Sequence, residues 1–278
     1  MMVMSHPTGV LLCRPDYFQL VDVKNPFMAG QSPVDTEKAR RQWESVRDAF
    51  IAGGLAVHEV EPVAGAEDMV FTANPAFTGL DRDGRRVAVA SRMKHPSRRA
   101  EVDRTMSRLA ELGYRTDDSI PESVAFEGGG DAVWHPGKHV IYGGYGARTS
   151  AGAYTFLERA FGAEIVPLRL ADERFYHLDT ALCALDEETA IVVPGAFDAE
   201  GLSTLETRFS RVLKLDSNEA LTMAANAAAA RDRTVVIEQA AAQTIPQLRD
   251  LGYHVLPVDT SEFRKSGGSV YCMKQYLF

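Results

Sequence analysis

A helix followed directly by a strand is the pattern that decides the fold, and it first occurs in residues 36–60, TEKARRQWESVRDAFIAGGLAVHEV. Residues 36–52 have the apolar spacing of an amphipathic helix, glycines at 53 and 54 end it, and residues 55–60 alternate as a strand does. Glycine just past the last apolar position is typical of a left-handed helix cap. The same order recurs in three further segments, with helices expected at 97–112, 150–161 and 240–251 and glycine at 113, 162 and 252.

The spacing of these glycines indicates a repeat. Gly54, Gly113, Gly162 and Gly252 lie 59, 49 and 90 residues apart, and the longest interval holds one weaker unit, a helix at 198–209 before a strand at 212–215. The chain thus divides into five units of about 50 residues, which bury their faces only by packing against neighbours. A doubly wound sheet has a similar rhythm and is the alternative. No Pro- or Ser-rich linker interrupts the chain, so we expect one domain over residues 1–278.

The composition argues against several classes of protein. The chain has 278 residues, 30 basic and 38 acidic, and its net charge of −8 lacks the basic footprint of nonspecific nucleic-acid binding. No run approaches the roughly 18 apolar residues of a membrane span, and MMVMSHPTGVLLCRPDYF at the start does not resemble a signal peptide. Three cysteines are too few for a disulfide framework, so we expect a cytoplasmic protein with Cys13 and Cys183 in strand cores.

Two motifs supply candidate catalytic residues. In GGSVYC, Cys272 ends an expected short strand after a glycine pair, where a thiol near a base can act as a nucleophile. A small buried hydrophobe is the alternative for this cysteine. In FYHLDT, an expected strand would place His177 and Asp179 on one face, combining a general acid/base with an anchor for a cation. An exposed strand with incidental polar alternation is the alternative for this pair.

Two further motifs supply candidate binding residues. FEGGGD places Glu127 and Asp131 around three glycines, which favour neither helix nor strand and suit a close approach of the backbone to a ligand. An acidic turn is the alternative. FTANP, after an expected strand start at residues 69–70, and NPFM contain Asn74 and Asn25. Asn before Pro is also a common loop opener.

The arginines and the missing motifs narrow the chemistry. Arg98 in PSRR and Arg148 in GGYGART could each bind a carboxylate with two hydrogen bonds, although an exposed charge at a helix start explains Arg98 equally well. HExxH, paired CxxC and clustered histidines are absent, so no metal site is expected. Phosphate-loop, GxGxxG and GxSxG motifs are also absent. A thiol site without a metal or a cofactor remains.

Taken in order, these motifs resemble those of the guanidino-group-modifying, or pentein, superfamily. The order is FTAN, PSRR, FEGGGD, a glycine-rich stretch ending in RT, YHLDT and GGSVYC, and the resemblance extends from Cys13 to Cys272. The superfamily includes dimethylarginine dimethylaminohydrolases, arginine deiminases, arginine dihydrolases and amidinotransferases. The resemblance implies an α/β fold, a five-bladed propeller of ββαβ repeats forming a single amidinotransferase-like catalytic domain, in agreement with the repeat count.

The resemblance also implies roles for the singled-out residues. Cys272 would be the nucleophile, His177 the general acid/base, and Glu127 the acid that orients the histidine. Asp179 would hold the guanidinium, and Arg148 and Arg98 would hold the α-carboxylate of a small arginine-type substrate. The extra glycine in EGGGD makes the part of Asp131 the least defined. A homo-oligomer is compatible with the superfamily.

One departure bears on the substrate. Asn74 stands where deiminases and dimethylaminohydrolases usually place Asp. An amide can both donate and accept hydrogen bonds, so it could also bind a neutral ureido group. The pair Asn25 and Asn74 resembles that of arginine dihydrolases, and the acid at Asp179 suits an unmethylated guanidinium. We therefore expect a cysteine hydrolase of C–N bonds acting on arginine in preference to methylated arginine. A dimethylarginine dimethylaminohydrolase, an amidinotransferase and a non-catalytic arginine-binding protein are the alternatives.

Overall fold

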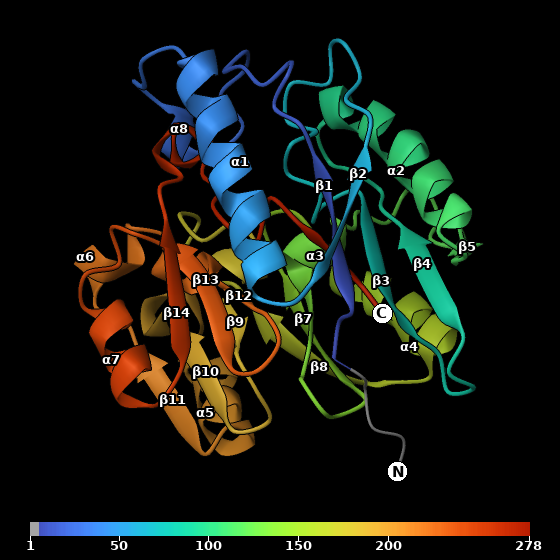
Figure 1. Cartoon of the computed structure of the whole chain (residues 1–278). Coiled ribbons are helices and arrows are strands. Elements are labelled where there is room, and N and C mark those ends of the chain that lie inside the picture. Colours follow the sequence, from blue (N-terminus) through green and yellow to red (C-terminus); the bar gives the residue numbers. More distant parts are fainter. Residues whose placement is uncertain (1–5) are drawn as a thin grey trace.

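Five three-stranded sheets form the blades of an α/β propeller, with helices packed outside them (Figure 1). The computed structural model describes residues 6–278. The single-domain prediction for residues 1–278 and the interpretation of the N-terminal stretch also cover residues 1–5, which lie outside the described residues. The sheet orders are β15-β1-β2, β3-β4-β5, β6-β7-β8, β9-β10-β11 and β12-β13-β14. This arrangement confirms the five units and the propeller, whereas a doubly wound fold would have one continuous sheet.

The strands and helices are mostly short. The strands are β1 (Gly9–Cys13), β2 (Ala56–Val60), β3 (Ala76–Leu80), β4 (Arg86–Ala90), β5 (Arg115–Asp117), β6 (Ala132–Trp134), β7 (Val140–Tyr145), β8 (Glu164–Arg169), β9 (Leu182–Ala184), β10 (Thr189–Val192), β11 (Arg211–Lys214), β12 (Ala228–Ala229), β13 (Thr234–Glu238), β14 (His254–Val258) and β15 (Gln275–Leu277). The α-helices are α1 (Thr36–Ala52), α2 (Arg99–Glu111), α3 (Gly128–Asp131), α4 (Tyr154–Phe161), α5 (Ala199–Arg208), α6 (Ser217–Ala220), α7 (Thr244–Asp250) and α8 (Ser261–Arg264). The 3-10 helices are η1 (Pro26–Met28), η2 (Pro96–Arg98), η3 (Ala151–Ala153), η4 (Leu178–Thr180), η5 (Pro194–Ala196) and η6 (Ala224–Asn226).

Each blade repeats one chain path. Its first strand is antiparallel to the middle strand, and a helix then carries the chain back to a third strand parallel to the middle one. The crossover helices are α1, α2, α4, α5 and α7. Gly54, Gly113, Gly162 and Gly252 all have a positive φ, which confirms the predicted glycine stops.

The first strand of one blade comes from the far end of the chain. β15 pairs antiparallel with β1, with Gly9 opposite Leu277. We call β3, β6, β9, β12 and β15 the inner strands. One consequence for function is that the segments leading into these five strands, though far apart in sequence, all lie at the same end of the propeller.

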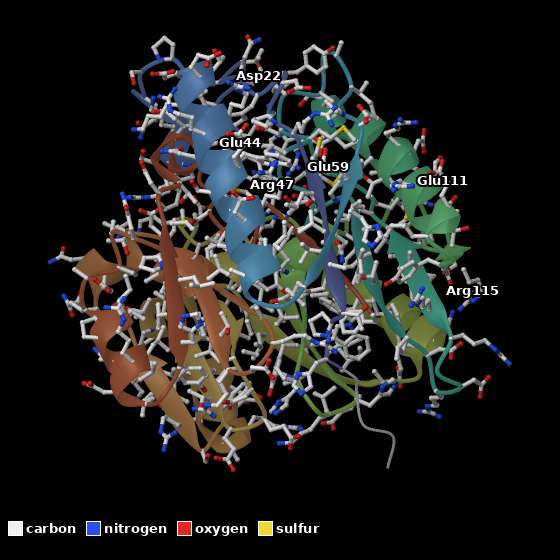
Figure 2. All side chains as sticks on the ribbon, viewed as in Figure 1. Asp22, Glu44, Arg47, Glu59, Glu111 and Arg115 are labelled. Atoms are coloured by element: carbon white, nitrogen blue, oxygen red, sulfur yellow. The ribbon has the colours of Figure 1, made fainter. Side chains whose placement is uncertain are left out.

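Apolar residues fill the blades, and charged residues cover the outside. Helix α1 begins after Asp35, whose side chain accepts a hydrogen bond from the Lys38 amide, and it buries Trp43 and Phe50 against the sheets. The outward faces of α1 and α2 carry charged side chains such as Glu44 and Glu111, as Figure 2 shows. Cys13 and Cys183 are buried in β1 and β9, as predicted.

Four local predictions were wrong. The segments around residues 69–70 and 270–272 are turns rather than strands, and residues 178–180 form η4, with His177 as its N-terminal cap. The glycines of FEGGGD form the short helix α3. All four segments lead into inner strands. Hydrogen bonds from neighbouring blades replace a regular strand ladder there. The local sequence pattern therefore did not determine their conformation.

Within residues 6–278, no helix is long and apolar enough to cross a membrane. In the same range, no group of three or more His, Cys, Asp or Glu side chains is arranged to hold a metal ion.

Candidate active site

The predicted residues come together where the inner strands begin. Each blade contributes a polar residue two to five positions before its inner strand, namely Asn74, Glu127, His177, Asn226 and Cys272. A small cavity of about 20 Å³ lies among them, and it is lined by six of the predicted residues: Cys272, His177, Asn74, Asn25, Arg98 and Arg148. A volume of this size holds about one water molecule. The site is therefore closed, with no space for a larger molecule.

Cys272 is held in a turn by hydrogen bonds rather than by a strand. The Asn226 Oδ1 atom accepts hydrogen bonds from the Ser269 and Cys272 amides, and its Nδ2 atom donates to Cys272 Sγ over 3.2 Å. Cys272 Sγ also lies 3.1 Å from Asp179 Oδ2. Burial raises the pKa of the Cys272 thiol well above its ordinary value, and the negative charge of Asp179 raises it further. The resting site therefore holds a protonated thiol that donates to a carboxyl group.

Asp179 has one carboxylate oxygen without a partner. Its side chain is fully buried, and Oδ1 has no hydrogen-bond partner among the described residues. Burial raises the pKa of Asp179 to about 7, although the hydrogen bond from Cys272 acts in the opposite direction. A buried acceptor left unsatisfied is costly, and an N–H donor of a bound cation would satisfy it.

His177 is oriented by Glu127. Its Nε2 atom lies 2.7 Å from Glu127 Oε2, and the same oxygen accepts a hydrogen bond from Arg148 Nη1 over 3.0 Å. Burial would raise the pKa of Glu127, but the hydrogen bond and charge of His177, together with Arg148, hold it well below its usual range. Glu127 therefore stays ionised, and accepting from Nε2 leaves the Nδ1 atom of His177 available to move a proton.

Asn74 presents its amide nitrogen to the site. Its Oδ1 atom accepts a hydrogen bond from Arg98 Nη1 over 3.0 Å, and its Nδ2 atom lies 3.5 Å from His177 Nδ1. Arg98 is itself fixed by Glu101, with contacts of 2.9 and 2.7 Å, and by the Asp68 and Phe71 carbonyls. Arg98 therefore determines which way the Asn74 amide faces, and the face directed at the site is a donor.

The three remaining predicted acids lie behind the cavity wall. Glu127, Asp179 and Asp131 are buried and are not among the residues that line the cavity. Asp131 uses both oxygens inside the protein, since Oδ2 accepts from Thr149 Oγ1 over 2.6 Å and Oδ1 accepts from the Leu178 amide over 3.1 Å. This residue joins α3 to the His177 segment.

The loop between β1 and α1 covers the cavity. Lys24 Nζ lies 2.7 Å from Glu67 and 2.9 Å from Asp68, and Asn25 Nδ2 donates to the Ser266 carbonyl over 2.9 Å. Arg148 Nη2 donates to the Lys24 carbonyl, and its guanidinium stacks on Tyr176 with 4.8 Å to the ring centroid. The closed cavity is far too small for an amino acid, and this loop forms part of its wall.

Sequence reasoning missed several residues that hold the site in place. They are Lys24, Asp68, Glu101, Tyr176 and Asn226. Asn226 did carry a signal, since it is the one polar residue in the run Ala224–Ala230. Lys24 and Tyr176 pair with residues of other blades, and Glu101 pairs with Arg98 three positions earlier.

Comparison with known proteins places this geometry in context. A family model described as eukaryotic N,N-dimethylarginine dimethylhydrolase matches residues 14–278. The chain is 35% identical to the N(G),N(G)-dimethylarginine dimethylaminohydrolase of Mycobacterium tuberculosis, covering 93% of this chain and 82% of that protein.

A second relative has a different printed activity. The bifunctional arginine dihydrolase/ornithine cyclodeaminase ArgZ of Synechocystis sp. is 32% identical over 97% of this chain, which spans only 38% of that protein. The crystal structure of the N-terminal domain of cyanobacterial ArgZ, a Cys-to-Ser mutant bound to substrate, superposes with a TM-score of 0.90 at 29% identity over 97% of each chain.

Proposed function

The chain belongs to the dimethylarginine dimethylaminohydrolase family of the pentein superfamily, and on that premise we propose that it hydrolyses C–N bonds of an arginine-type guanidino group through Cys272. One observation carries the proposal: Cys272 and His177 line the same cavity, and each of them is paired with a buried acid, Asp179 and Glu127 respectively. The relatives named above are hydrolases by their printed names.

Binding of the cation would activate the thiol. The guanidinium donates to the free Oδ1 of Asp179, so that this carboxyl group ionises beside a positive charge. A nearby cation also favours the thiolate of Cys272, and the thiol proton passes to Nδ1 of His177. Arg148, beside the cavity, is the residue that we propose to bind the α-carboxylate of the substrate.

Two half-reactions then follow. The thiolate attacks the guanidinium carbon, a C–S bond forms, and the C–N bond breaks as His177 gives its proton to the departing amine. A water molecule next gives a proton to His177 and attacks the S-linked carbon, and the C–S bond breaks to leave a ureido product. Glu127 stabilises the positively charged imidazole at each stage.

The orientation of Asn74 supports arginine as a substrate that is hydrolysed twice. A guanidinium has only donors, so the Asn74 amide nitrogen offers it nothing, but a neutral ureido product has a carbonyl oxygen that this nitrogen can hold. A second attack by Cys272 would form a C–S bond and release another ammonia. Water would then break the C–S bond, and the resulting carbamate would break down to ornithine and carbon dioxide. We therefore propose an arginine dihydrolase.

A product assay tests this proposal. The full chain is incubated separately with arginine, citrulline and asymmetric dimethylarginine, and ammonia, methylamines, citrulline and ornithine are measured. Ornithine from both arginine and citrulline is expected. No product from any of the three would overturn the hydrolase assignment, and citrulline as the only product of arginine would overturn the second hydrolysis.

A dimethylarginine dimethylaminohydrolase is the second candidate. The family model and the 35% identical relative, which covers most of both chains, favour it. In the same assay this enzyme would release dimethylamine and citrulline from asymmetric dimethylarginine and leave arginine largely intact.

A further inference from the structure

A second cavity lies at the opposite end of the inner strands. Its volume is about 830 Å³, within the range of small-molecule sites. All five inner strands or the turns that follow them contribute to its wall, including Phe77, Trp134, Ala184, Ala229 and Tyr276. None of these residues lines the catalytic cavity. The molecule therefore has two cavities along one axis.

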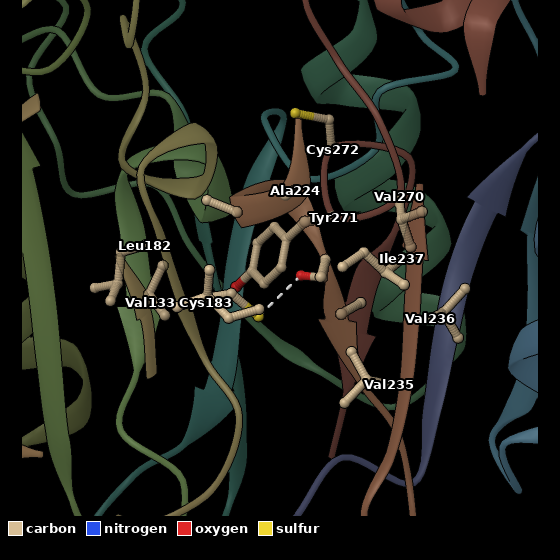
Figure 3. Packing of buried hydrophobic residues seen from close by; sticks show 14 of the residues in the cluster. Val133, Leu182, Cys183, Ala224, Val235, Val236, Ile237, Val270, Tyr271 and Cys272 are labelled. Carbon is tan, nitrogen blue, oxygen red and sulfur yellow. Dashed lines mark hydrogen bonds between the residues drawn. The ribbon is translucent and has the colours of Figure 1, made fainter. Parts of the chain in front are cut away.

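The wall between the two cavities is the turn that carries the nucleophile. Cys272 lines the catalytic cavity, whereas Tyr271 and Lys274 line the second one. Figure 3 shows the Cys272 sulfur and the Tyr271 ring pointing in opposite directions from consecutive positions. Lys274 precedes β15 and sends its side chain to the same side as Tyr271.

Lys274 has a buried side-chain nitrogen without a hydrogen-bond acceptor among the described residues. Its residue exposure is 1%, and Nζ lies 3.0 Å from the Tyr271 ring centroid and 3.5 Å from that of Tyr276. No hydrogen bond or ion pair of Nζ is formed with any residue from 6 to 278. An ammonium group has three N–H donors, and the two ring faces occupy two of them. The third donor is left for whatever fills the cavity.

Four acidic residues line this cavity, and none of them forms a hydrogen bond or an ion pair with Lys274: Asp186, Glu187, Glu188 and Asp232. At the rim, Asp186 is already bound by Arg233 over 3.2 Å and by the Tyr253 hydroxyl over 2.5 Å. Burial lowers the pKa of Lys274 well below its ordinary value, and the charge of Asp179, on the catalytic side, acts in the opposite direction. An anion in the second cavity would remove that penalty.

The walls indicate what kind of anion fits. Phe77, Trp134 and Phe278 give the cavity an apolar side, and Lys274 is its one buried basic residue. The arginines that also line the cavity are exposed: Arg211, Arg231 and Arg233. A phosphate carries about two charges and needs several donors, whereas a carboxylate matches one ammonium group. We propose that this cavity binds a small organic carboxylate, with its charged end on Lys274 and an apolar body against Phe77 and Trp134. This site is separate from the proposed function and does not depend on it.

Calorimetry with three matched probes tests the site. The full chain is titrated with 4-phenylbutyrate, its neutral amide and the corresponding amine, 4-phenylbutylamine. Saturable binding of the carboxylate is expected, about tenfold or more tighter than that of the amide, because a hydrogen bond to a charged group is lost. The amine should not bind. Equal binding of carboxylate and amide, or no saturable binding of the carboxylate, overturns the proposal.

Variants assign the binding to the cavity. Lys274→Met should remove the preference for the carboxylate, whereas Lys214→Met, at an exposed lysine on β11, should retain it. Ala229→Phe, which leaves Lys274 in place and fills the cavity, should abolish binding of both probes. Each variant is used if it melts cooperatively. If Lys274→Met does not fold, Ala229→Phe decides. A preference for the carboxylate retained in Lys274→Met, or carboxylate binding retained in Ala229→Phe, refutes the assignment.

Discussion

The two ends of the inner strands are built from the same five strands but in opposite ways. At one end, charged and polar side chains fill the space to about 20 Å³, and nearly every one of them is bound to another. At the other end, about 830 Å³ is left among aromatic and aliphatic walls, and a single buried ammonium group faces it. The difference lies in the connections, because longer segments enter the strands at the catalytic end and tight turns such as those after β9 and β12 leave them at the other.

This contrast shows how one ring of strands holds a dense polar cluster at one end and a large cavity at the other. The catalytic end holds Glu127 ionised and Cys272 protonated within one hydrogen-bonded network, which is costly for the folded state. The other end carries none of that network. Substitutions at the catalytic end should therefore change turnover, and matched substitutions elsewhere should not.

The largest effect is expected from the nucleophile. Cys272→Ser should lower turnover at least about a thousandfold, because a serine hydroxyl is a far weaker nucleophile here. Cys183→Ala, which removes a buried thiol bonded only to the Ala227 carbonyl, should keep turnover within about twofold. Product formation from arginine and from dimethylarginine measures both variants, and turnover retained in Cys272→Ser would remove its assigned role.

The next largest effect is expected at Glu127. Glu127→Gln removes the charge that stabilises the His177 imidazolium, so kcat should fall by about a hundredfold or more. Glu187→Gln, at the rim of the second cavity, is the matched control and should leave kcat nearly unchanged. Steady-state kinetics of both variants make the comparison, and equal kcat values would show that the carboxylate has no part in proton transfer.

A smaller effect, on the ratio of products, is expected at Asn74. Asn74→Asp replaces a donor to a ureido oxygen with an acceptor for a guanidinium, so the citrulline-to-ornithine product ratio from arginine should rise by about tenfold. Asn218→Asp, near the start of α6, provides a control outside both cavities. Quantified amino-acid products report the ratio. If the ratio is unchanged, the orientation of the amide does not determine the product.

The smallest effect is expected on stability, and it depends on pH. The folded-state pKa of Asp179 is raised to about 7, above its unfolded value, so the folded protein binds its proton more tightly and loses stability as pH rises from about 4 through about 7. Asp179→Asn removes that loss. Its melting temperature should exceed that of the parent chain by about 5 °C at pH 8, and by less at pH 5.

The control for this measurement is Asp22→Asn, on the exposed covering loop. Scanning calorimetry of both variants at the two pH values is sufficient. A stability gain in Asp179→Asn that is equal at both pH values would contradict the raised pKa as its cause.

The sequence allowed the fold to be predicted because the repeat is local. The stops at Gly54 and Gly113 depend on positive φ, and a helix of α1's length has a clear apolar face. The conformation of the site segments was not predictable in the same way. His177 and Cys272 lie in short turns whose hydrogen bonds reach residues about 50 positions away, such as Glu127 and Asn226, and no local pattern encodes such partners.

The sequence predicted which residues form the site better than it predicted the hydrogen bonds that position them. Six of the predicted residues line one cavity. Asn74, His177 and Cys272 precede inner strands, and the other three lie between a middle strand and its crossover helix. Some of their supports emerge only from packing between blades, such as Asn226 beside Cys272. Lys274 looked unremarkable in sequence, since its significance depends on two tyrosine rings and on an empty volume beyond them.

The closing of the ring by β15 has a consequence for how the protein is made. Thr8 bonds to Leu277, 269 positions later, and Cys272 lies just before that last strand. β1 is made long before its partner β15, and contacts between segments this distant in sequence form slowly. Until β15 docks, the thiol and the imidazole are not brought together. A chain in which β15 has not yet docked therefore lacks the assembled cluster around Cys272 and His177.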